Sequence, residues 1–357
     1  MDYVRNSTSS LKLLSELLLS PESTSCQVKR LSAPELHHLQ ALAMTNHVIM
    51  RSFPRLGSIA ELTGDHRTSS WIASEVQKES ARIHHALKFL ERICAALEQR
   101  GCPAIVIKSL DHWPDLGSDL DLFTSAVPTD VVKAMTSEFN ASVADRSWGD
   151  RLANKWNFVV PGLPELVEIH IGRLGQTGEQ TALTHSLSAR ARMLTIDGGT
   201  FRVAAPEDRI VISTLQRMYR HFYIRLCDIV DNASLLDARE IDFEYLRSLG
   251  SSAGLWEGIA TYLNIVSQYV EAYRGFGVPL PALVTGSARF GREKIFFRRD
   301  FLRVPIVPQS INLYAGELRT LLLRGELRNT LRLSLLPGLA TAAALEQKIT
   351  GSDKGIW

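Results

Sequence analysis

The sequence predicts an α+β protein in which a small mixed β-sheet is flanked by N-terminal and C-terminal helical regions. Apolar residues recur at helical spacing through about the first hundred residues and again after Pro206. Between these regions, short apolar runs of strand type alternate with turn residues and one helical segment. We therefore expect a helical region at 1–100, a sheet-containing core at 101–205, a helical domain at 206–288 and a basic helical tail at 289–357.

Three helices are expected before the core. Leucines at helical spacing between Leu11 and Leu19 predict the first. Residues 33–51 form the second, with Ser32 as its N-cap. The third runs over 69–100 and ends at a glycine, the residue that most readily adopts the left-handed conformation after a helix.

The core is expected to begin after Pro103, where the pattern changes to short apolar runs. One helix, residues 131–139, interrupts these runs. The predicted strands are 104–107, 120–123, 141–143, 156–160 and 166–171.

Helices return at Pro206, because proline followed by two acidic residues is typical of a first helical turn. Further helices are expected at about 224–237, 242–249 and 253–274. Leucines and arginines between 313 and 333 predict an amphipathic helix.

The composition is that of an ordinary globular chain. Hydrophobic residues make up 45% of the 357 and charged residues 22%, which excludes collagen-like, coiled-coil and disordered classes. Lysine and arginine number 40 against 38 acidic residues. The resulting formal charge of +2 gives no global field that favours nucleic acid or a membrane.

Cysteine usage and hydropathy predict a cytoplasmic protein. The isolated cysteines are Cys26, Cys94, Cys102 and Cys227. None forms a CxxC pair, which is typical of free thiols in a reducing compartment. Acidic residues interrupt the N-terminal apolar run, so no secretory signal is expected. The apolar run at 331–345 contains Arg332 and Pro337 and is too short to be a transmembrane segment.

The near-neutral charge hides a basic tail. Residues 289–332 hold ten Lys/Arg and four Asp/Glu, a local charge of +6. Arginines at 298, 299 and 303 lie among phenylalanines, a pattern that suits nucleic acid or another anionic partner. Packing of an amphipathic helix with a solvated arginine face is the alternative, and both interpretations stay open.

Residues 106–123 carry the most informative pattern in the chain. A strand leads to Lys108-Ser109, and a loop with a Gly-Ser turn at Ser118 leads to the next strand. Residues two apart in a strand share a face, so Asp119 and Asp121 point the same way. Because two such carboxylates repel each other, this spacing indicates a bound cation, and Mg²⁺ prefers oxygen ligands.

A second acidic strand follows some fifty residues later. Glu168 and His170 share one face of the run 167–171, and Glu168 supplies a third carboxylate for a two-metal phosphoryl-transfer site. Spacing alone is weak evidence, because the acids at 240, 242 and 244 have the same spacing at a predicted helix start. The ordered set of motifs is much stronger evidence than any one of them.

This order of motifs resembles the DNA polymerase β-like nucleotidyltransferase superfamily. Within it, the chain is most similar to a broad, largely uncharacterised bacterial family with a Lys-Gly pair, a Ser-Asp-x-Asp strand and an acid-x-His motif. The resemblance covers about residues 80–255 and includes the Pro-Glu-Asp at 206–208 and an Arg-Leu-x-Asp pattern at 225–231. Ser109 departs from the glycine that this family usually has, which makes a close backbone approach to phosphate less assured.

The resemblance implies a nucleotidyltransferase core and a set of residue roles. Asp119 and Asp121 would bind two Mg²⁺ ions, with Mn²⁺ as a substitute, and Glu168 would bind the metal nearer the acceptor and help to deprotonate its hydroxyl. Lys108 and Ser109 would hold the β- and γ-phosphates of a nucleoside triphosphate such as ATP. Ser118 is a further nucleotide-binding candidate. Apart from the resemblance, four basic residues flank the predicted sheet and are candidate triphosphate clamps, with an ordinary surface charge as the alternative for each: Lys155, Arg173, Arg192 and Arg217.

The acceptor is left open by the sequence: a small molecule, a peptide, a glycan or a tRNA would each suit the reaction. A toxin-like enzyme that modifies tRNA and an inactive nucleotide-binding relative are the alternatives to a general nucleotidyltransferase. His170 either orients a carboxylate or is a packed strand histidine. Asp228 and Asp231 share a helix face and either line the cleft or pair with arginines.

Overall fold

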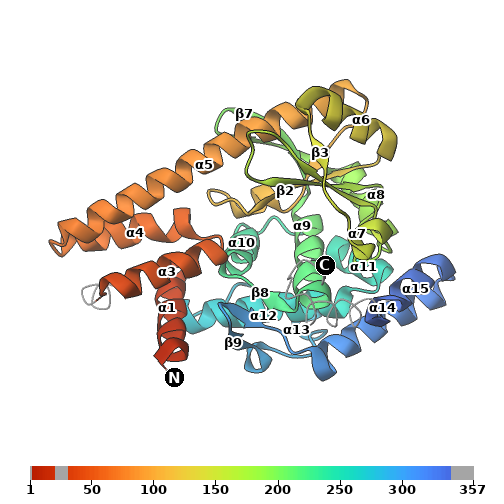
Figure 1. The fold of residues 1–357 in the computed structure, drawn as a ribbon. Coiled ribbons are helices and arrows are strands. Elements are labelled where there is room, and N and C mark those ends of the chain that lie inside the picture. The colour runs from red at the N-terminus through yellow and green to blue at the C-terminus, as the bar shows by residue number, and fades with distance from the viewer. Residues whose placement is uncertain (1, 21–30, 339–357) are drawn as a thin grey trace.

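A seven-stranded mixed sheet and two helical regions make up the part of the chain that the computed structural model describes, residues 2–20 and 31–338. Figure 1 shows the sheet at the upper right, with α5 (His66–Gln99) running across it, and most of the later helices below it. The predicted mixed sheet flanked by helices is therefore present.

The N-terminal helices differ from the prediction at one point. They are α1 (Asp2–Leu19), α3 (Ala33–Thr45), α4 (Ile49–Leu62) and α5. The single helix predicted over 33–51 is two helices, because Asn46 leaves the helical path for tertiary contacts. Its Oδ1 accepts a hydrogen bond from the backbone N–H of Leu226 at 3.0 Å, and His47 follows with a left-handed φ of 51°.

The central sheet contains all five predicted strand regions and two more. Their order is β3-β4-β5-β2-β1-β7-β6. Three helices, α6 (Pro128–Phe139), α7 (Trp148–Leu152) and α8 (Thr181–Arg190), lie between strands in the sequence. The strands are β1 (Ile105–Val106), β2 (Asp119–Thr124), β3 (Ser142–Val143), β4 (Lys155–Val159), β5 (Leu166–Ile171), β6 (Arg192–Ile196) and β7 (Gly199–Val203).

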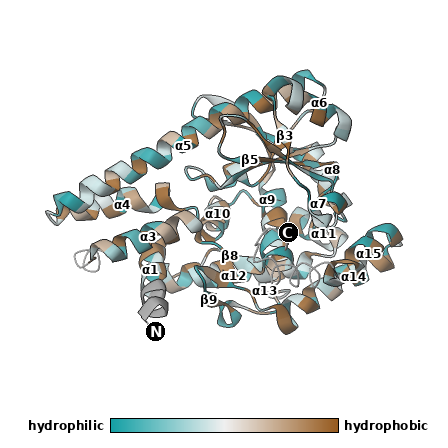
Figure 2. Ribbon diagram, viewed as in Figure 1, coloured by the Kyte–Doolittle hydropathy of each residue, from teal (hydrophilic) through white to brown (hydrophobic). Residues whose placement is uncertain are grey.

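The two inner strands β2 and β5 run parallel and place unlike residues on their two faces. Leu120 and Leu122 of β2 are fully buried on one face, against Leu90 and Ile93 of α5. Figure 2 shows the matching alternation of hydrophilic and hydrophobic residues along α5. The other face of β2 turns toward the later helices, where Phe123 joins a second and larger core. The polar residues at the start of β2 therefore lie between the two cores.

The β6–β7 hairpin is absent from the sequence prediction. Met193 in β6 is 65% exposed and follows Leu187 and residues 189–191 of the preceding helical segment closely, so its apolar residues do not stand out as a separate strand. A signal was present in the turn, because Asp197 and Gly198 have φ values of 52° and 82° and Asp-Gly favours a two-residue hairpin turn.

The helices after Pro206 agree with the prediction, and a small second sheet joins them to the tail. The sheet has the order β8-β10-β9. The predicted basic helical tail therefore contains a β-hairpin before its helices. The elements are α9 (Pro206–Thr214), a π-helical turn η2 (Leu215–Arg220), β8 (Tyr223–Ile224), α10 (Leu226–Asp237), α11 (Phe243–Ala253), α12 (Trp256–Arg274), α13 (Ala282–Thr285), β9 (Phe296–Arg298) and β10 (Phe301–Arg303).

The amphipathic segment predicted over 313–333 is also two helices. α14 (Ile311–Leu323) ends where Gly325 adopts a left-handed φ of 72°, and α15 (Leu327–Ser334) follows. Leu321 and Leu333 are buried between them, whereas the arginines at 319, 324 and 328 are exposed. Packing with a solvated arginine face therefore describes these two helices.

Arg51 connects the N-terminal helices to the loop between β1 and β2. Its Nε lies 2.9 Å from Asp115 in that loop, and its Nη1 lies 2.6 Å from Asp231 of α10. Asp115 also accepts a hydrogen bond from the backbone of Met50 at 2.6 Å. These buried contacts fix the loop that carries the acidic motif.

Two further predictions concern cysteines and membrane spans. Cys94, Cys102 and Cys227 are free thiols, and Cys26 lies outside the described residues. None of the helices in the described ranges combines the length and apolar character needed to cross a bilayer.

A buried carboxyl group attaches α14 to the core. Glu317 is fully buried and accepts a hydrogen bond from Gln180 Nε2 at 2.5 Å. Burial raises the pKa of Glu317 well above its usual value, and the nearby Glu179 charge raises it further, while the Gln180 bond opposes the shift. Above the usual pKa of 4.5 the folded protein therefore loses stability, because Glu317 ionises more readily in the unfolded chain than in this junction.

We expect Glu317→Gln to increase the melting temperature at pH 8. A carboxyl whose folded pKa exceeds its unfolded pKa destabilises the protein progressively as pH rises above the unfolded value of 4.5. The stabilisation should therefore shrink as pH falls toward 4.5. The exposed Glu244→Gln is the control, and thermal unfolding at both pH values is the measurement. A variant less stable than the wild type at pH 8 would contradict the account.

Candidate active site

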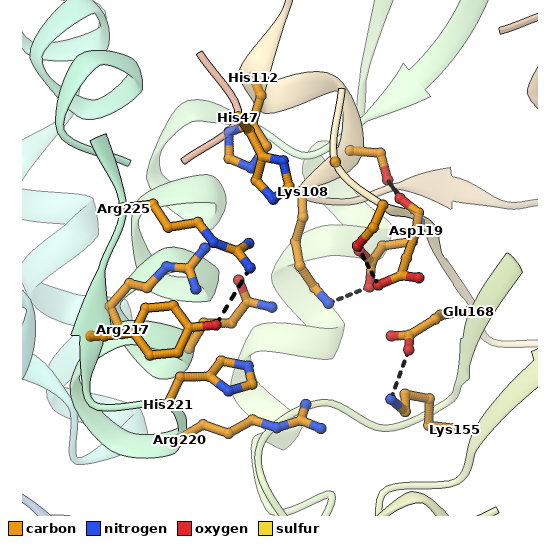
Figure 3. Close-up of a pocket in the computed structure, with 16 residues that line it drawn as sticks. His47, Lys108, His112, Asp119, Lys155, Glu168, Arg217, Arg220, His221 and Arg225 are labelled. Carbon is orange, nitrogen blue, oxygen red and sulfur yellow. Dashed lines mark hydrogen bonds and ion pairs between the residues drawn. The ribbon is translucent and has the colours of Figure 1, made fainter. Parts of the chain in front are cut away.

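The predicted acidic residues line a cavity between the central sheet and the helices after residue 206. Figure 3 shows acidic side chains on one side of this cavity and arginines with His221 on the other. We call these sides the acidic wall and the cationic wall. The acidic wall is formed by Ser118, Asp119, Asp121, Lys155 and Glu168, and the cationic wall by Gln216, Arg217, Arg220, His221, Tyr223 and Arg225.

The register of β2 and β5 builds the acidic wall. Asp121 pairs directly with Glu168, and Phe123 pairs with His170. Directly paired residues of neighbouring strands point to the same face, so the Asp121 and Glu168 side chains lie together. Asp119, two residues before Asp121, extends the same face. The predicted association of the three acids is therefore present in the structure.

Mutual repulsion is visible in the ionisation of Asp119. Burial raises its pKa to about 6, and the charges of Glu168 and Asp121 contribute to the shift. Ser118 Oγ donates a hydrogen bond to Asp119 Oδ2 at 3.2 Å, which opposes it only partly. A cation at this wall would relieve the repulsion.

Asp121 is the best-compensated acid of the wall. Burial raises its pKa, but the Lys108 ammonium and His170 lower the pKa by more than burial raises it. The net pKa of Asp121 therefore lies well below the usual range. Lys108 Nζ forms an ion pair with Asp121 Oδ1, and His170 Nε2 lies 3.9 Å from the same oxygen. Burial lowers the pKa of His170 to about 4, so its ring is neutral at pH 7.

The backbone at Lys108 is strained in a way that aims this side chain. Lys108 has φ 63° and ψ −57°, and the N–H of Ser109 bonds the carbonyl of Ile107 at 2.7 Å. These values describe a γ-turn, a rare conformation for a residue with a side chain. Strain of this kind is concentrated at functional sites.

Ser109 fastens the start of β2. Its buried hydroxyl accepts a hydrogen bond from the N–H of Asp121 at 2.7 Å and donates one to the carbonyl of Asp119 at 3.2 Å. Glycine at this position would provide neither bond. Serine at this position therefore supports the backbone of the two aspartates, and a phosphate contact by Ser109 stays a prediction.

Lys155 is a buried bridge on the acidic wall. Its Nζ lies 3.0 Å from Glu168 Oε1 and 3.0 Å from Asp150 Oδ1. Asp150 is in turn fixed by Ser147, whose Oγ accepts a hydrogen bond from the Asp150 N–H at 3.0 Å. Lys155 therefore holds Glu168 in place. Its ammonium group contacts these two acids, and its predicted role as a triphosphate clamp stays a prediction.

The cationic wall comes from a short stretch at the end of α9. The π-helical turn η2 carries Arg217 and Arg220, and Arg225 stands just before α10. π-Helical turns are frequent at functional sites because they displace side chains from the regular helical spacing. Sequence periodicity does not reveal such a turn, so Arg220 and Arg225 were missed as site residues.

The arginines of this wall differ in their partners. Arg217 Nε lies 2.7 Å from Asp228 Oδ2, and both side chains are buried. Arg220 and Arg225 have no carboxylate partner among the described residues, and the Nε of each is buried without a hydrogen bond there. Two guanidinium groups thus reach the cavity with their charge uncompensated.

Burial, together with the neighbouring arginine charges, keeps two histidines of the cavity neutral. Burial lowers the pKa of His221 well below its usual value, and Arg220, Arg217 and Arg225 lower it further. Burial likewise lowers the pKa of His47, on the other side of the cavity, and Arg225 contributes. Because these imidazole rings do not take up a proton beside the arginines, the space between them suits an anion.

The other predicted candidates lie apart from the cavity. Arg173 bonds the carbonyl of Leu152, and Arg192 lies 3.7 Å from Glu240, so neither is a clamp here. Asp228 pairs with Arg217 and Asp231 with Arg51 and His112, which favours the structural interpretation of both.

No family model matches the chain, and no curated protein matches its sequence. The resemblance to nucleotidyltransferases therefore stays a prediction from the motifs.

We expect Lys155→Met to lower the free energy of unfolding by about 3 kcal/mol, because it leaves the buried Asp150 and the half-buried Glu168 without their cation. The exposed Lys133→Met on α6 is the matched control and should change stability by less than about 0.5 kcal/mol. Urea denaturation measures both. Equal stability of the two variants would show that the bridge does not hold Glu168.

Proposed function

We propose that the protein is a Mg²⁺-dependent nucleotidyltransferase. It would transfer a nucleoside monophosphate from a nucleoside triphosphate to a hydroxyl or phosphate of an acceptor and release pyrophosphate. The observation that carries this proposal is the pairing of three clustered carboxylates with two uncompensated arginines across one cavity. A metal ion would bind the carboxylates of the acidic wall, and the phosphates of a nucleotide would bind both that metal ion and the arginines of the cationic wall.

The donor set suits a divalent cation. Ligand atoms of Asp121, Glu168 and His170 all lie within 4.8 Å of one another, and Asp119 extends the same face. Carboxylate oxygens are the ligands that Mg²⁺ and Mn²⁺ favour, whereas imidazole suits other metals better. Asp119, Asp121 and Glu168 would therefore hold the metal, and His170 would orient Asp121. When bound, Mg²⁺ supplies charge neutralisation and polarises the phosphoryl oxygens.

Side chains that line the cavity would bind the phosphates, support Asp121 and accept the acceptor's proton. Arg220 and Arg225 bind the phosphates of the triphosphate, because their charges are uncompensated. Lys108 lies between the walls in Figure 3 and holds Asp121. Glu168, which pairs with Lys155, would accept the proton of the attacking hydroxyl.

The reaction is an in-line displacement. The acceptor oxygen forms a bond to the α-phosphorus, the bond from that phosphorus to the bridging oxygen of the β-phosphate breaks, and pyrophosphate leaves with the bond electrons. The acceptor proton passes to Glu168. Because the triphosphates on which this reaction depends are abundant in the cytoplasm, the proposal fits the location expected from the sequence.

Nucleotide binding without catalysis is the second candidate function. The Lys108–Asp121 and Lys155–Glu168 ion pairs already neutralise two of the three acids. If the ammonium groups occupy the places that metals need, the cavity binds triphosphates by its cationic wall alone. Metal binding separates the two functions, because only the enzyme requires it.

Replacing two metal-binding acids tests the proposed function. We expect the double variant Asp119→Asn/Asp121→Asn to abolish Mn²⁺ binding, measured by calorimetry, and to reduce NTP turnover at least about a thousandfold. Turnover is followed as pyrophosphate release with mixed labelled nucleotides and a panel of acceptors.

The chain provides a matched control for this variant. Glu240→Gln/Glu244→Gln also removes two negative charges, both on exposed side chains outside the cavity, and should change neither readout. Unchanged Mn²⁺ affinity in the aspartate variant would contradict the metal site. Unchanged NTP turnover in the aspartate variant would contradict the catalytic role of Asp119 and Asp121.

Arg220 tests the cationic wall separately. We expect Arg220→Gln to weaken binding of a fluorescent ATP analogue about tenfold, because one charge-assisted hydrogen bond to phosphate is lost. Mn²⁺ affinity should stay at the wild-type value. The exposed Arg247→Gln on α11 is the control, and an ATP affinity unaffected by Arg220→Gln would remove this residue from the site.

A further inference from the structure

A second hollow lies beside the active-site cavity, on the β9–β10 hairpin. It encloses about 430 Å³, and its lining includes Phe296, Arg298, Arg299 and Arg303. We call it the hairpin hollow. His221 lines both this hollow and the active-site cavity, so a ligand that fills the hollow reaches the edge of the active site.

The arginines of the hairpin hollow lack acidic partners. Arg298, Arg299 and Arg303 form no ion pair with a carboxylate among the described residues, whereas Arg289 and Arg324 of the same tail pair with Glu257 and Glu326. Burial lowers the pKa of Arg303, and the charges of Arg299 and Arg298 lower it further. Three mutually repelling cations in one hollow indicate an anionic ligand.

Aromatic rings accompany these cations. Phe296 is 48% exposed and lines the hollow. The rings of Tyr223 and Phe301 stack with their centroids 4.2 Å apart. Arg225 from the active-site cavity and Arg303 from the hollow both lie over this ring pair, at 5.2 to 5.8 Å from the ring centroids. The pair thus connects the cationic wall to the hollow.

We propose that the hairpin hollow binds the phosphate backbone of a single-stranded nucleic acid acceptor, whose terminal hydroxyl enters the active site past His221. This inference rests on the proposed function. The terminal hydroxyl oxygen bonds to the α-phosphorus of the nucleotide, pyrophosphate leaves, and the proton passes to Glu168. The product is a strand longer by one nucleotide.

Exposure and composition favour this acceptor over other anions. Arg298 and Arg299 are exposed, and exposed arginines bind a polyanion well because each phosphate contact releases a counterion. A small anion would instead need buried converging donors. A peptide of acidic residues would satisfy the arginines but offers no aromatic ring to Phe296, whereas every nucleobase stacks on an aromatic ring.

The test measures binding of fluorescent 12-nucleotide RNA and DNA strands by anisotropy, in EDTA and without nucleotide. The first variant is Arg298→Gln/Arg299→Asn, in which asparagine tolerates the left-handed φ of 47° at Arg299. The second is Phe296→Ala. The control Arg67→Gln/Lys88→Gln removes two exposed charges from α5, far from the hollow.

We expect each hollow variant to bind the strand about tenfold more weakly and the control to bind as the wild type does. The arginine variant should also reduce the slope of log K against log salt by about 1.4, since each phosphate contact on a single strand contributes about 0.7. Binding of either RNA or DNA with these losses supports the proposal.

Three results would overturn it: no strand binding by the wild type, equal binding by the hollow variants, or equally tight binding of a 12-residue polyglutamate. Retained binding of the fluorescent ATP analogue shows that the variants are folded. Asp119→Asn/Asp121→Asn should bind the strand normally. Failure of the acceptor proposal is therefore distinguishable from failure of the proposed catalytic function.

Discussion

The parallel register between β2 and β5 is the constraint on which the site depends. It sets Asp121 directly opposite Glu168 while Leu120 and Leu122 remain buried beneath α5. A shift of one residue would move the leucines into the cavity and the acids into the core, so burial of the apolar face fixes the position of the carboxylates. Like charges are thus held together by packing energy rather than by attraction between them.

Several local features follow from that constraint. The γ-turn at Lys108 brings one ammonium to Asp121, and Lys155 brings another to Glu168. Ser109 fastens the strand that carries the aspartates. Opposite them, the π-helical turn η2 carries arginine charge without acidic partners among the described residues. The acidic wall therefore suits a cation, and the cationic wall suits an anion. A metal ion with a polyphosphate satisfies both.

The sequence predicted the acidic wall because strand periodicity is local and the motifs are short. It also predicted five strand regions and most helices. It missed what depends on tertiary contacts: Asn46 breaks a predicted helix by capping α10, and the tail hairpin pairs with β8. Arg220 escaped notice because no local pattern marks a π-helical turn. Lys155 was recognised by its location, but its bridge between two acids required the three-dimensional pairing of β4 with β5.

A crystal structure with Mn²⁺ and a non-hydrolysable α,β-methylene nucleotide tests the central claim most directly. The account predicts an anomalous manganese peak bound by Asp119, Asp121 and Glu168, with phosphate oxygens in contact with Arg220 or Arg225. It also predicts that Lys108 and Lys155 move away from their acids or share them with the metal. Nucleotide bound outside this cavity, or phosphates seated there with both lysine ion pairs intact and no manganese peak, would contradict it.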